Sequence, residues 1–397
     1  MGRDQQNRSE RICHLHLKII HVFYLLFVVI GLSLLFNTSI ILCLKNFSPT
    51  FLSFLYSIPN SPKPSELLPA PTPPPPPLPI STFSRSDQEL FKRAAMVPSI
   101  QGSSLNYHTY STHVPKVAFM FLTRGPLPLR RLWEGFFKGN QGFYSIYVHS
   151  HPCYIETLPR DSVFYGTRIP SQPVFWGTAT MIDAERRLLA NALLDLSNQR
   201  FVLLSESCIP LFNFTTIYGH LMNSNLSFIA LADDPRKAGR GRYNPKMSPA
   251  INITNWRKGS QWFEVHRGLA IHIVSDQKYY TIFQQYCVPP CYSDEHYIPT
   301  LVNILYPELN SNRSLTWADW SPPRDGPHPR EFGWVDITDE LLNRIRFGSD
   351  CIYNGNTSTT MCFLFARKFL TTALESLLRM PPLLLDFNPF HGVDKDA

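Results

Sequence analysis

Residues 117–122 read VAFMFL, residues 143–150 read FYSIYVHS, and residues 201–204 read FVLL. Each run is short and apolar, and the first ends in Thr-Arg-Gly-Pro, which is a turn signal, so we interpret all three as strands. Two helical stretches, residues 128–139 and 178–197, separate them. Strands that alternate with helices indicate βαβ units. The sequence therefore predicts an α/β domain with a mainly parallel sheet, which binds ligands at the carboxyl ends of its strands.

The second helical stretch has the clearest pattern in the chain. Thr178 or Thr180 can cap its first turn. Five apolar residues recur at helical spacing and predict one buried face: Met181, Ala184, Leu188, Ala192 and Leu196.

The composition excludes two broad classes of protein. Of the 397 residues, 44% are hydrophobic and 17% are charged, whereas a disordered chain is less hydrophobic and more charged. A multi-span membrane protein would contain several apolar runs of about 20 residues. The formal charge of +7 comes from 37 basic and 30 acidic residues without a dense basic block, so we expect no nucleic-acid partner.

One apolar run is long enough to cross a bilayer as a helix. Residues 19–44 read IIHVFYLLFVVIGLSLLFNTSIILCL and contain no charged residue. The run is longer than the apolar core of a cleaved signal peptide, and no clear cleavage site follows it, so we interpret it as a retained signal anchor rather than a signal peptide or a buried core helix. Residues 1–18 hold four basic and two acidic residues, which predicts a cytoplasmic tail and a lumenal or extracellular remainder.

A proline-rich segment follows the predicted anchor. Eleven of the 35 prolines lie between Pro59 and Pro79, including the run PTPPPPPLP. Polyproline II is extended and stiff, so we expect residues 45–110 to form a stem that separates the membrane from a globular domain over residues 115–385. The alternative, a ligand for an SH3-like domain, does not fit a lumenal segment.

Cysteines and glycosylation sequons agree with a lumenal location. Six cysteines follow the anchor: Cys153, Cys208, Cys287, Cys291, Cys351 and Cys362. An even number suits an oxidising compartment, and the spacing does not resemble a zinc site. Beyond the anchor, six Asn-x-Ser/Thr sequons begin at Asn46, Asn213, Asn225, Asn252, Asn312 and Asn356.

Four places carry candidate chemistry. Ser205-Glu206-Ser207 follows a predicted strand, and one carboxylate between two hydroxyls is a poor metal site, so this triplet either contacts a ligand or only ends the strand. The loop 233–247, DDPRKAGRGRYNPKM, is rich in Arg and Lys and can wrap an anionic or polyhydroxylated ligand, although a solvated basic loop is the simpler alternative.

The third place is CYSDEHYIPTL, residues 291–301, where Ser293 can cap a helix whose first turn holds Asp294 and Glu295. A disulfide between Cys287 and Cys291 could pin this acidic turn, and a carboxylate fixed in a cleft suits general-base catalysis. The fourth is CFLFARKF, residues 362–369, which predicts a buried strand that delivers Arg367 and Lys368 to its end, one of them pointing inward.

Taken together, these stretches resemble the plant branch of the core-2/I-branching β-1,6-N-acetylglucosaminyltransferase family (family 14), which are type II Golgi proteins. The resemblance spans residues 115–380 and rests on KVAFMFLTRGPLPLRRLWEGFF, FYSIYVHSHP, RFVLLSESCIPL, GRGRYNPKM, WRKGSQWFEVHRG, CYSDEHYIPTLV, LTWADWS and CFLFARKF. It implies a GT-A-like fold with a Rossmann-like sheet. It also implies an inverting transfer from a UDP-sugar to a glycan or glycoprotein hydroxyl, without a metal or another cofactor.

The resemblance also assigns roles by position. Glu295 matches the catalytic base, and Lys368 matches the basic residue that binds the donor diphosphate, with Arg346 or Arg344 as its partner. Phe121, Thr123 and His149 lie where the family binds the nucleotide, although the animal enzymes have His in place of Thr123 and Asp in place of His149. Asp233, Arg240, Arg242 and Trp320 fall at or near acceptor-binding positions.

The donor and acceptor have alternatives within and outside the family. N-acetylglucosamine is the donor sugar that the family name implies, but relatives transfer xylose or glucuronic acid, and a cell-wall or arabinogalactan-type acceptor suits a plant relative. A non-catalytic lumenal glycan-binding protein is the alternative from another class. A glycoside hydrolase would need two cooperating carboxylates, and the adjacent Asp294 and Glu295 point about 100° apart on a helix.

Overall fold

The computed structural model of the protein describes residues 85–96, 114–321 and 328–380. The predicted tail, the anchor, most of the stem and the sequon at Asn46 lie outside these ranges. The chain divides into two units, residues 1–76 and 77–397, and every described residue belongs to the second. Among the described helices, none is long and apolar enough to span a bilayer.

A four-stranded sheet forms the centre of the domain, with the strand order β2-β1-β3-β5. The strands are β1 (Lys116–Leu122), β2 (Tyr144–His149), β3 (Asn198–Ser205) and β5 (Glu264–His266). β1 pairs in parallel with both β2 and β3, and β5 pairs antiparallel with β3. The prediction of a mainly parallel sheet in an α/β domain is therefore confirmed, and this sheet fits a GT-A-like fold.

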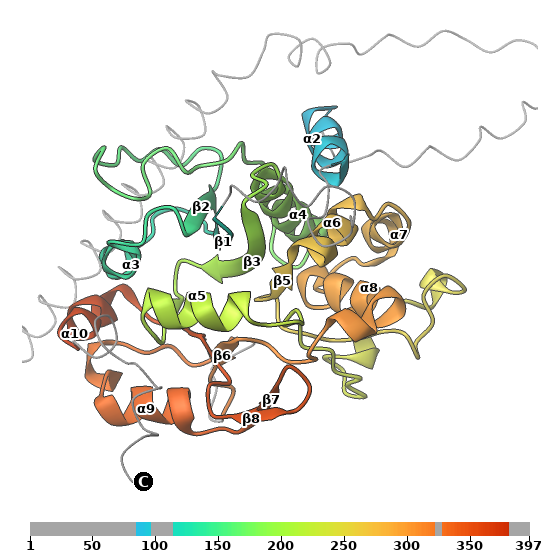
Figure 1. Cartoon of the computed structure of the whole chain (residues 1–397). Helices are drawn as coiled ribbons and strands as arrows, with labels where there is room; N and C mark the ends of the chain where they lie inside the picture. The colour runs from blue at the N-terminus through green and yellow to red at the C-terminus, as the bar shows by residue number, and fades with distance from the viewer. Residues whose placement is uncertain (1–84, 97–113, 322–327, 381–397) are drawn as a thin grey trace, which may run out of the picture. The chain divides into compact units, whose positions relative to one another are not determined.

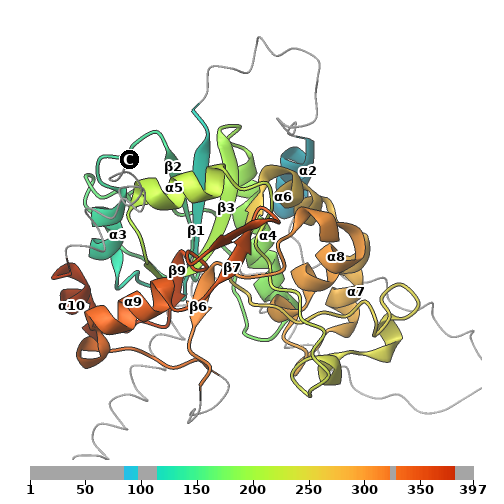
Figure 2. The same cartoon turned by 60° about the horizontal axis from the view of Figure 1, so that its bottom comes forward.

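Helices cover both faces of this sheet because its inner strands, β1 and β3, are apolar on both sides. In β1, Val117, Phe119 and Phe121 enter one core with α3 (Arg130–Phe137), α5 (Phe214–Met222), α9 (Asp339–Phe347) and α10 (Leu374–Leu378). The alternate residues Ala118, Met120 and Leu122 enter a second core with α4 (Ala179–Leu193), α6 (Arg267–Ser275), α7 (Lys278–Tyr286) and α8 (Tyr297–Leu305). Figures 1 and 2 show α3, α9 and α10 on one side of the strands and α6, α7 and α8 on the other.

The strongest predicted helix is α4, which ends at Leu193 rather than at residue 197. Thr178 caps it, as predicted, and its side chain accepts a hydrogen bond from the Thr180 amide at 3.3 Å. The pattern predicted one buried face, but α4 is buried on several sides because it packs between the sheet, α2 and α6. Four charged side chains of this helix are buried as well: Asp183, Glu185, Arg186 and Arg187.

A helix within the predicted stem belongs to the domain. The helix α2 (Arg85–Met96) packs against α4 and α6 and buries Phe91 and Ala94. The predicted domain began at residue 115, next to the first apolar strand. The folded domain also includes the earlier residues of α2.

The C-terminal part of the domain forms a second sheet with the order β4-β9-β6. Its strands are β4 (Ile209–Pro210), β9 (Phe365–Arg367) and β6 (Thr316–Ala318), and a separate hairpin joins β7 (Cys351–Tyr353) to β8 (Thr357–Thr359). The predicted strand over residues 362–369 is therefore present but shorter. The domain contains the disulfides Cys287–Cys291, which the sequence analysis considered, and Cys351–Cys362.

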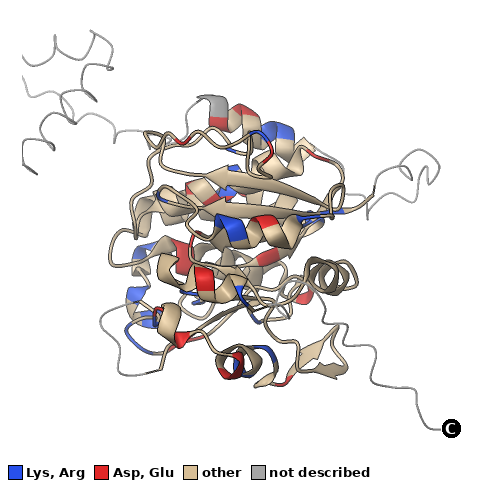
Figure 3. Ribbon diagram, turned by 90° about the vertical axis from the view of Figure 1, so that its left-hand side faces the viewer, with Lys and Arg blue, Asp and Glu red and all other residues tan. Residues whose placement is uncertain are grey.

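Charged residues are distributed over the whole domain, and most of its sequon asparagines are exposed. In the view of Figure 3, basic and acidic residues are interspersed along the ribbon. Four of the sequon asparagines are exposed, namely Asn225, Asn252, Asn312 and Asn356. Asn213 is partly buried because its side chain caps α5 by accepting a hydrogen bond from the Thr216 amide at 2.9 Å.

Candidate active site

A cavity of about 830 Å³ opens at the carboxyl ends of the parallel strands. Residues at the end of β2 and directly after β1 and β3 line it, which is the ligand position that this topology predicts. The predicted or candidate residues that line it are Thr123, His149, Ser205, Glu206, Asp234, Arg236, Asp294, Glu295, Trp320, Arg367 and Lys368. A volume of this size is typical of small-molecule sites.

The ends of β1 and β3 are held by local hydrogen bonds. The Thr123 hydroxyl donates to the Gly125 carbonyl at 2.5 Å and accepts from the Gly125 amide at 3.0 Å, which fixes the turn after β1. After β3, the hydroxyls of Ser205 and Ser207 lie 3.0 Å apart and are buried, while Glu206 lines the cavity. The serines therefore end the strand, and of this triplet Ser205 and Glu206, but not Ser207, line the cavity.

His149 is a neutral side chain at the end of β2. It is 1% exposed, and its Nδ1 atom is buried with no hydrogen-bond partner among the described residues. Burial, followed by the charge of Arg187, lowers its pKa from 6.5 to about 4. At neutral pH it can donate or accept a hydrogen bond in the cavity without adding charge.

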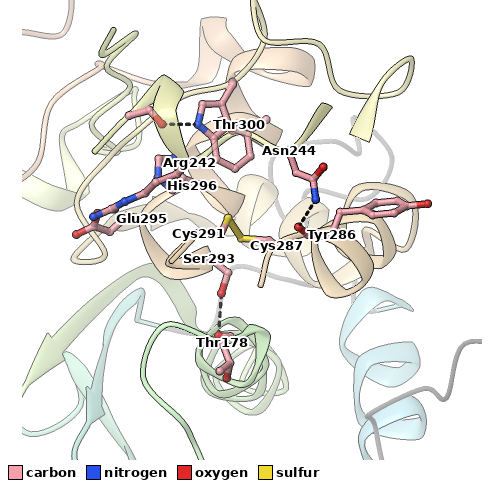
Figure 4. Close-up of a disulfide and its surroundings, with 12 residues drawn as sticks. Thr178, Arg242, Asn244, Tyr286, Cys287, Cys291, Ser293, Glu295, His296 and Thr300 are labelled. Atoms are coloured by element: carbon pink, nitrogen blue, oxygen red, sulfur yellow. Dashed lines mark hydrogen bonds and ion pairs between the residues drawn. A yellow bond between two sulfur atoms is a disulfide. The ribbon is translucent and has the colours of Figure 1, made fainter. Parts of the chain in front are cut away.

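Glu295 lies in the 3₁₀ turn η4 (Ser293–Glu295), and three contacts fix this turn. The disulfide Cys287–Cys291 ties the preceding loop to the end of α7, and the Ser293 hydroxyl donates to the Thr178 carbonyl at the start of α4 (Figure 4). The Gly259 amide donates to the Glu295 carbonyl at 2.8 Å. The expectation that Ser293 caps a helix is wrong, because α8 begins at Tyr297 and the Ser293 side chain is used in the contact with α4.

The Glu295 carboxylate is paired with two cations. Its Oε2 atom accepts from Arg242 Nη1 at 2.5 Å and lies 3.1 Å from Lys258 Nζ (Figure 4 shows the first contact). Burial would raise the pKa of Glu295, but the charges and hydrogen bonds of Lys258 and Arg242 outweigh it, and the pKa lies below 4.5. Glu295 is therefore ionised at neutral pH and can accept a proton.

The adjacent Asp294 has a different environment. It is 6% exposed, and burial together with the charge of Glu295 raises its pKa to about 6. The fully buried Glu185 of α4 lies behind it, and burial and the charge of Asp294 raise the pKa of Glu185 well above 4.5. Of these three acidic groups, Glu295 is the one with the charge and the exposure of a base.

A group of cations lines another part of the cavity. Arg124 follows β1, and Arg367 and Lys368 lie at the end of β9. Partial burial lowers the pKa of His328, and all three cations lower it further, so they lie close to this residue. Arg367 stacks on Trp262 with its Cζ atom 4.2 Å from the ring centre, and Lys368 Nζ lies 2.9 Å from Glu331 Oε1. Both residues line the cavity, whereas alternation along a strand had predicted that only one would point inward.

The basic loop 233–247 is an ordered structure. Arg240 makes two 2.7 Å hydrogen bonds to Asp233, Arg236 pairs with Asp234, and Arg242 reaches Glu295. Three of its arginines are thus paired with carboxylates of the same chain. Asp233 and Arg240 do not line the cavity, whereas the exposed ring of Trp320 does.

Three of the predicted donor-site residues lie outside the cavity lining. Phe121 is fully buried in β1 against Trp133 and Phe164. Arg346 is buried in α9 and donates to the Leu211 carbonyl at 2.5 Å. Arg344 is exposed on the same helix. Burial raises the pKa of Asp319, but hydrogen bonds of Ser321 and the charges of Arg330 and Arg344 outweigh burial and lower it.

Comparison with known proteins decides the family. A family model described as "Branch: Core-2/I-Branching enzyme" matches residues 117–346, which is more than half of the chain. The chain belongs to the core-2/I-branching enzyme family. Among curated proteins it is similar to "Glycosyltransferase BC10" of Oryza sativa subsp. japonica, with 37% identity over 306 residues, covering 66% of this chain and 76% of that protein. The protein is therefore a glycosyltransferase, as the sequence predicted.

The family match and the cavity overlap only in part. Thr123, His149 and Glu295 of this branching enzyme fall within the matched residues, but Arg367 and Lys368 lie beyond residue 346. The two cations enter the site because β9 is the central strand of the second sheet, between β4 and β6.

Sequence reasoning missed Arg124 and Lys258 as site residues of the glycosyltransferase. Arg124 carried a usable signal, because it is the second residue after the first predicted strand, where a parallel sheet places its ligand contacts. Lys258 carried none that sequence alone reveals. It reaches Glu295 only because residues 256–259 fold back against the Glu295 turn.

Proposed function

We propose that the protein is an inverting glycosyltransferase that moves a sugar, N-acetylglucosamine by family, from a UDP-sugar to a hydroxyl of a glycan or glycoprotein without a metal ion. One observation carries the proposal: an ionised carboxylate, Glu295, and a group of cations, Arg124, Arg367 and Lys368, line the same cavity. A single displacement needs one base for the incoming hydroxyl and positive charge for the leaving diphosphate.

The reaction then follows from these two groups. Glu295 accepts the proton of the acceptor hydroxyl as its oxygen forms a bond to the anomeric carbon of the donor. The bond between that carbon and the diphosphate oxygen breaks, and its electron pair leaves with UDP. Lys368 and Arg367 stabilise the charge that develops on the diphosphate. Attack from the face opposite the leaving group inverts the anomeric carbon.

The remaining assignments are made by position in the family. We propose that Thr123 and His149, with Phe121 behind them, form the nucleotide site, and that Arg344 or Arg346 assists at the diphosphate. Trp320, Asp233, Arg240 and Arg242 are proposed for the acceptor. The pairing of Asp233 with Arg240 supports a joint role, since a sugar hydroxyl can bind to both.

We place the enzyme in the Golgi membrane as a single-pass type II protein with a lumenal catalytic domain. The uncharged apolar run at residues 19–44 and the sequons support this topology. The two disulfides of the described domain fit an oxidising compartment. A plant cell-wall or arabinogalactan-type acceptor is proposed from the family branch.

The test is UDP release by the full-length chain with UDP-N-acetylglucosamine, UDP-glucuronic acid and UDP-xylose, in buffer with EDTA and with Mn²⁺. We expect release from one donor, undiminished by EDTA. Glu295→Gln should lower turnover roughly 10² to 10⁴-fold, whereas Glu340→Gln, on the exposed face of α9, should not.

Other outcomes select the alternatives. Release from UDP-glucuronic acid or UDP-xylose alone would make the protein a glucuronosyl- or xylosyltransferase. Loss of activity in EDTA with recovery on Mn²⁺ would contradict metal independence and direct attention to Glu206. No release from any donor would favour a non-catalytic glycan-binding protein.

A further inference from the structure

Both ion pairs of Glu295 end on the same carboxylate oxygen. Arg242 Nη1 lies 2.5 Å and Lys258 Nζ 3.1 Å from Oε2. For both cations the closest contact with this carboxylate is the one to Oε2. The arrangement leaves one oxygen of the base for a ligand in the cavity and uses the other for support.

The backbone that carries Lys258 is fixed on both sides. Lys258 and Ala232 exchange two backbone hydrogen bonds of 2.8 Å, which join this segment to the start of the basic loop. The next amide, that of Gly259, donates to the Glu295 carbonyl, and the preceding carbonyl, that of Arg257, is 2.8 Å from His296 Nδ1. Residues 257–259 and the Glu295 turn are therefore one hydrogen-bonded unit.

Gly259 has no room for a side chain, which keeps this unit close-packed. A Cβ atom at this position would lie 2.3 Å from the Ala230 carbonyl oxygen and 2.6 Å from a Pro299 side-chain atom. The Lys258 ammonium thus reaches Glu295 from a segment whose backbone is held in place by hydrogen bonds. Its side chain is 24% exposed and lines the cavity beside the carboxylate that it contacts.

We propose that Lys258 is a positioning residue for Glu295: it holds Oε2 so that Oε1 faces the acceptor hydroxyl, and it keeps the base ionised. The proposal rests on the proposed role of Glu295 as the base. Four groups with a charge or a titratable proton surround this carboxylate, namely Lys258, Arg242, Asp294 and His296. His296 is neutral near pH 7 because burial lowers its pKa to about 4. Asp234, whose pKa the charge of Lys258 lowers, is a further acidic neighbour of that lysine.

The expected effect of removing Lys258 has a definite sign. Lys258 lowers the pKa of Glu295, so its loss raises that pKa and leaves less of the base ionised in mild acid. With one cation instead of two on Oε2, the carboxylate also turns more freely. We expect Lys258→Met to move the acid limb of the pH–rate profile to higher pH and to lower kcat roughly 10-fold on the plateau, with KM for the donor unchanged.

The experiment compares Lys258→Met, Lys258→Arg and Lys138→Met in the full-length chain, with UDP release from the active donor as the readout. Lys258→Arg keeps the cation and should restore most of kcat and the wild-type acid limb. Lys138→Met, at the exposed end of α3, should change neither. An acid limb and a kcat in Lys258→Met that match those of the wild type would overturn the proposal.

A second measurement separates this inference from the proposed function. In chain labelled with ¹³C-carboxyl glutamate, the signal missing from Glu295→Gln identifies Glu295, and its titration needs no turnover. A higher titration midpoint in Lys258→Met, reversed in Lys258→Arg, supports the inference even where no donor is hydrolysed. An unchanged midpoint overturns it even where the enzyme is active.

Discussion

The guanidinium of Arg187 makes two hydrogen bonds to the carboxylate of Asp87, from Nε at 2.9 Å and from Nη2 at 3.1 Å, and both side chains are buried. Asp87 lies in α2 and Arg187 in α4. This ion pair therefore joins the helix that precedes the first strand to the central helix of the domain, whose N-terminus contacts the Glu295 turn through Thr178 and Ser293.

Removal of the Asp87 charge should destabilise the domain strongly. In Asp87→Asn the guanidinium of Arg187 stays buried without its counter-charge, and the free energy of unfolding should fall by about 3–5 kcal/mol. Chemical denaturation of the full-length chain measures this change. The control is Glu375→Gln, which breaks the exposed pair with Arg131 and should cost less than about 1 kcal/mol. Equal losses in the two variants would mean that α2 is not integral to the domain.

The cations at the end of β9 should contribute to binding of the diphosphate and not of the nucleoside. We expect Arg367→Met and Lys368→Met each to weaken UDP binding about 10-fold or more, because each removes a charge-assisted contact to phosphate. Calorimetric titration with UDP and with uridine distinguishes the two parts of the ligand. Uridine affinity should be unchanged, and an equal loss for uridine would contradict a diphosphate site at these residues.

Removal of either disulfide should lower stability and turnover, but the variant that loses less stability should lose more turnover. The Cys287–Cys291 loop is short, and its removal by Cys287→Ser/Cys291→Ser should cost about 2 kcal/mol, against about 3 kcal/mol for the longer Cys351–Cys362 loop. Turnover should fall more in the first variant, since that loop precedes the Glu295 turn. Urea unfolding and UDP release on the same samples make the comparison. A greater loss of turnover in the variant that lacks Cys351–Cys362 would refute the role of the first disulfide in placing Glu295.

Buried neutral histidines should make the protein less stable in acid. Burial, followed by the charges of Arg313 and Arg200, lowers the pKa of His220 to about 3, whereas an unfolded chain titrates at 6.5. Between these values the unfolded state binds the extra proton, so stability falls as the pH is lowered. We expect His220→Phe to flatten the pH dependence of the unfolding free energy by up to about 1.4 kcal/mol per pH unit between pH 4 and 6. Lys138→Met serves as the control, and an unaltered slope in His220→Phe would show that this histidine does not contribute.

The sequence predicted the parts of the fold that depend on local pattern. The apolar runs of β1, β2 and β3, the cap at Thr178 and the Cys287–Cys291 pair are all read from neighbouring residues, and each is confirmed. The helix α2 was missed because it follows the proline-rich segment and its burial depends on α4 and α6. Its Phe91 and Ala94 are buried in the core to which α4 and α6 contribute.

Sequence alone also predicted part of the candidate site, namely the residues near strand ends and those assigned by the family resemblance. Thr123 and Glu206 lie just after predicted strands, and His149 lies at the end of one. Glu295 and Lys368 were assigned through the family resemblance, and all five residues line the cavity. The contact of Lys258 with Glu295 and the use of Ser293 against α4 depend on segments that meet only in the folded chain. Spacing along the sequence contains no information about such contacts.

The position of β9 has a consequence for recognising members of this family from sequence. The family match ends at residue 346, yet the strand that carries Arg367 and Lys368 begins at Phe365 and pairs with both β4 and β6. A transcript or gene copy that stops after the matched region would still be classified as a branching enzyme. It would lack the middle strand of the second sheet and the two proposed diphosphate-binding cations, so family membership alone does not guarantee a complete donor site.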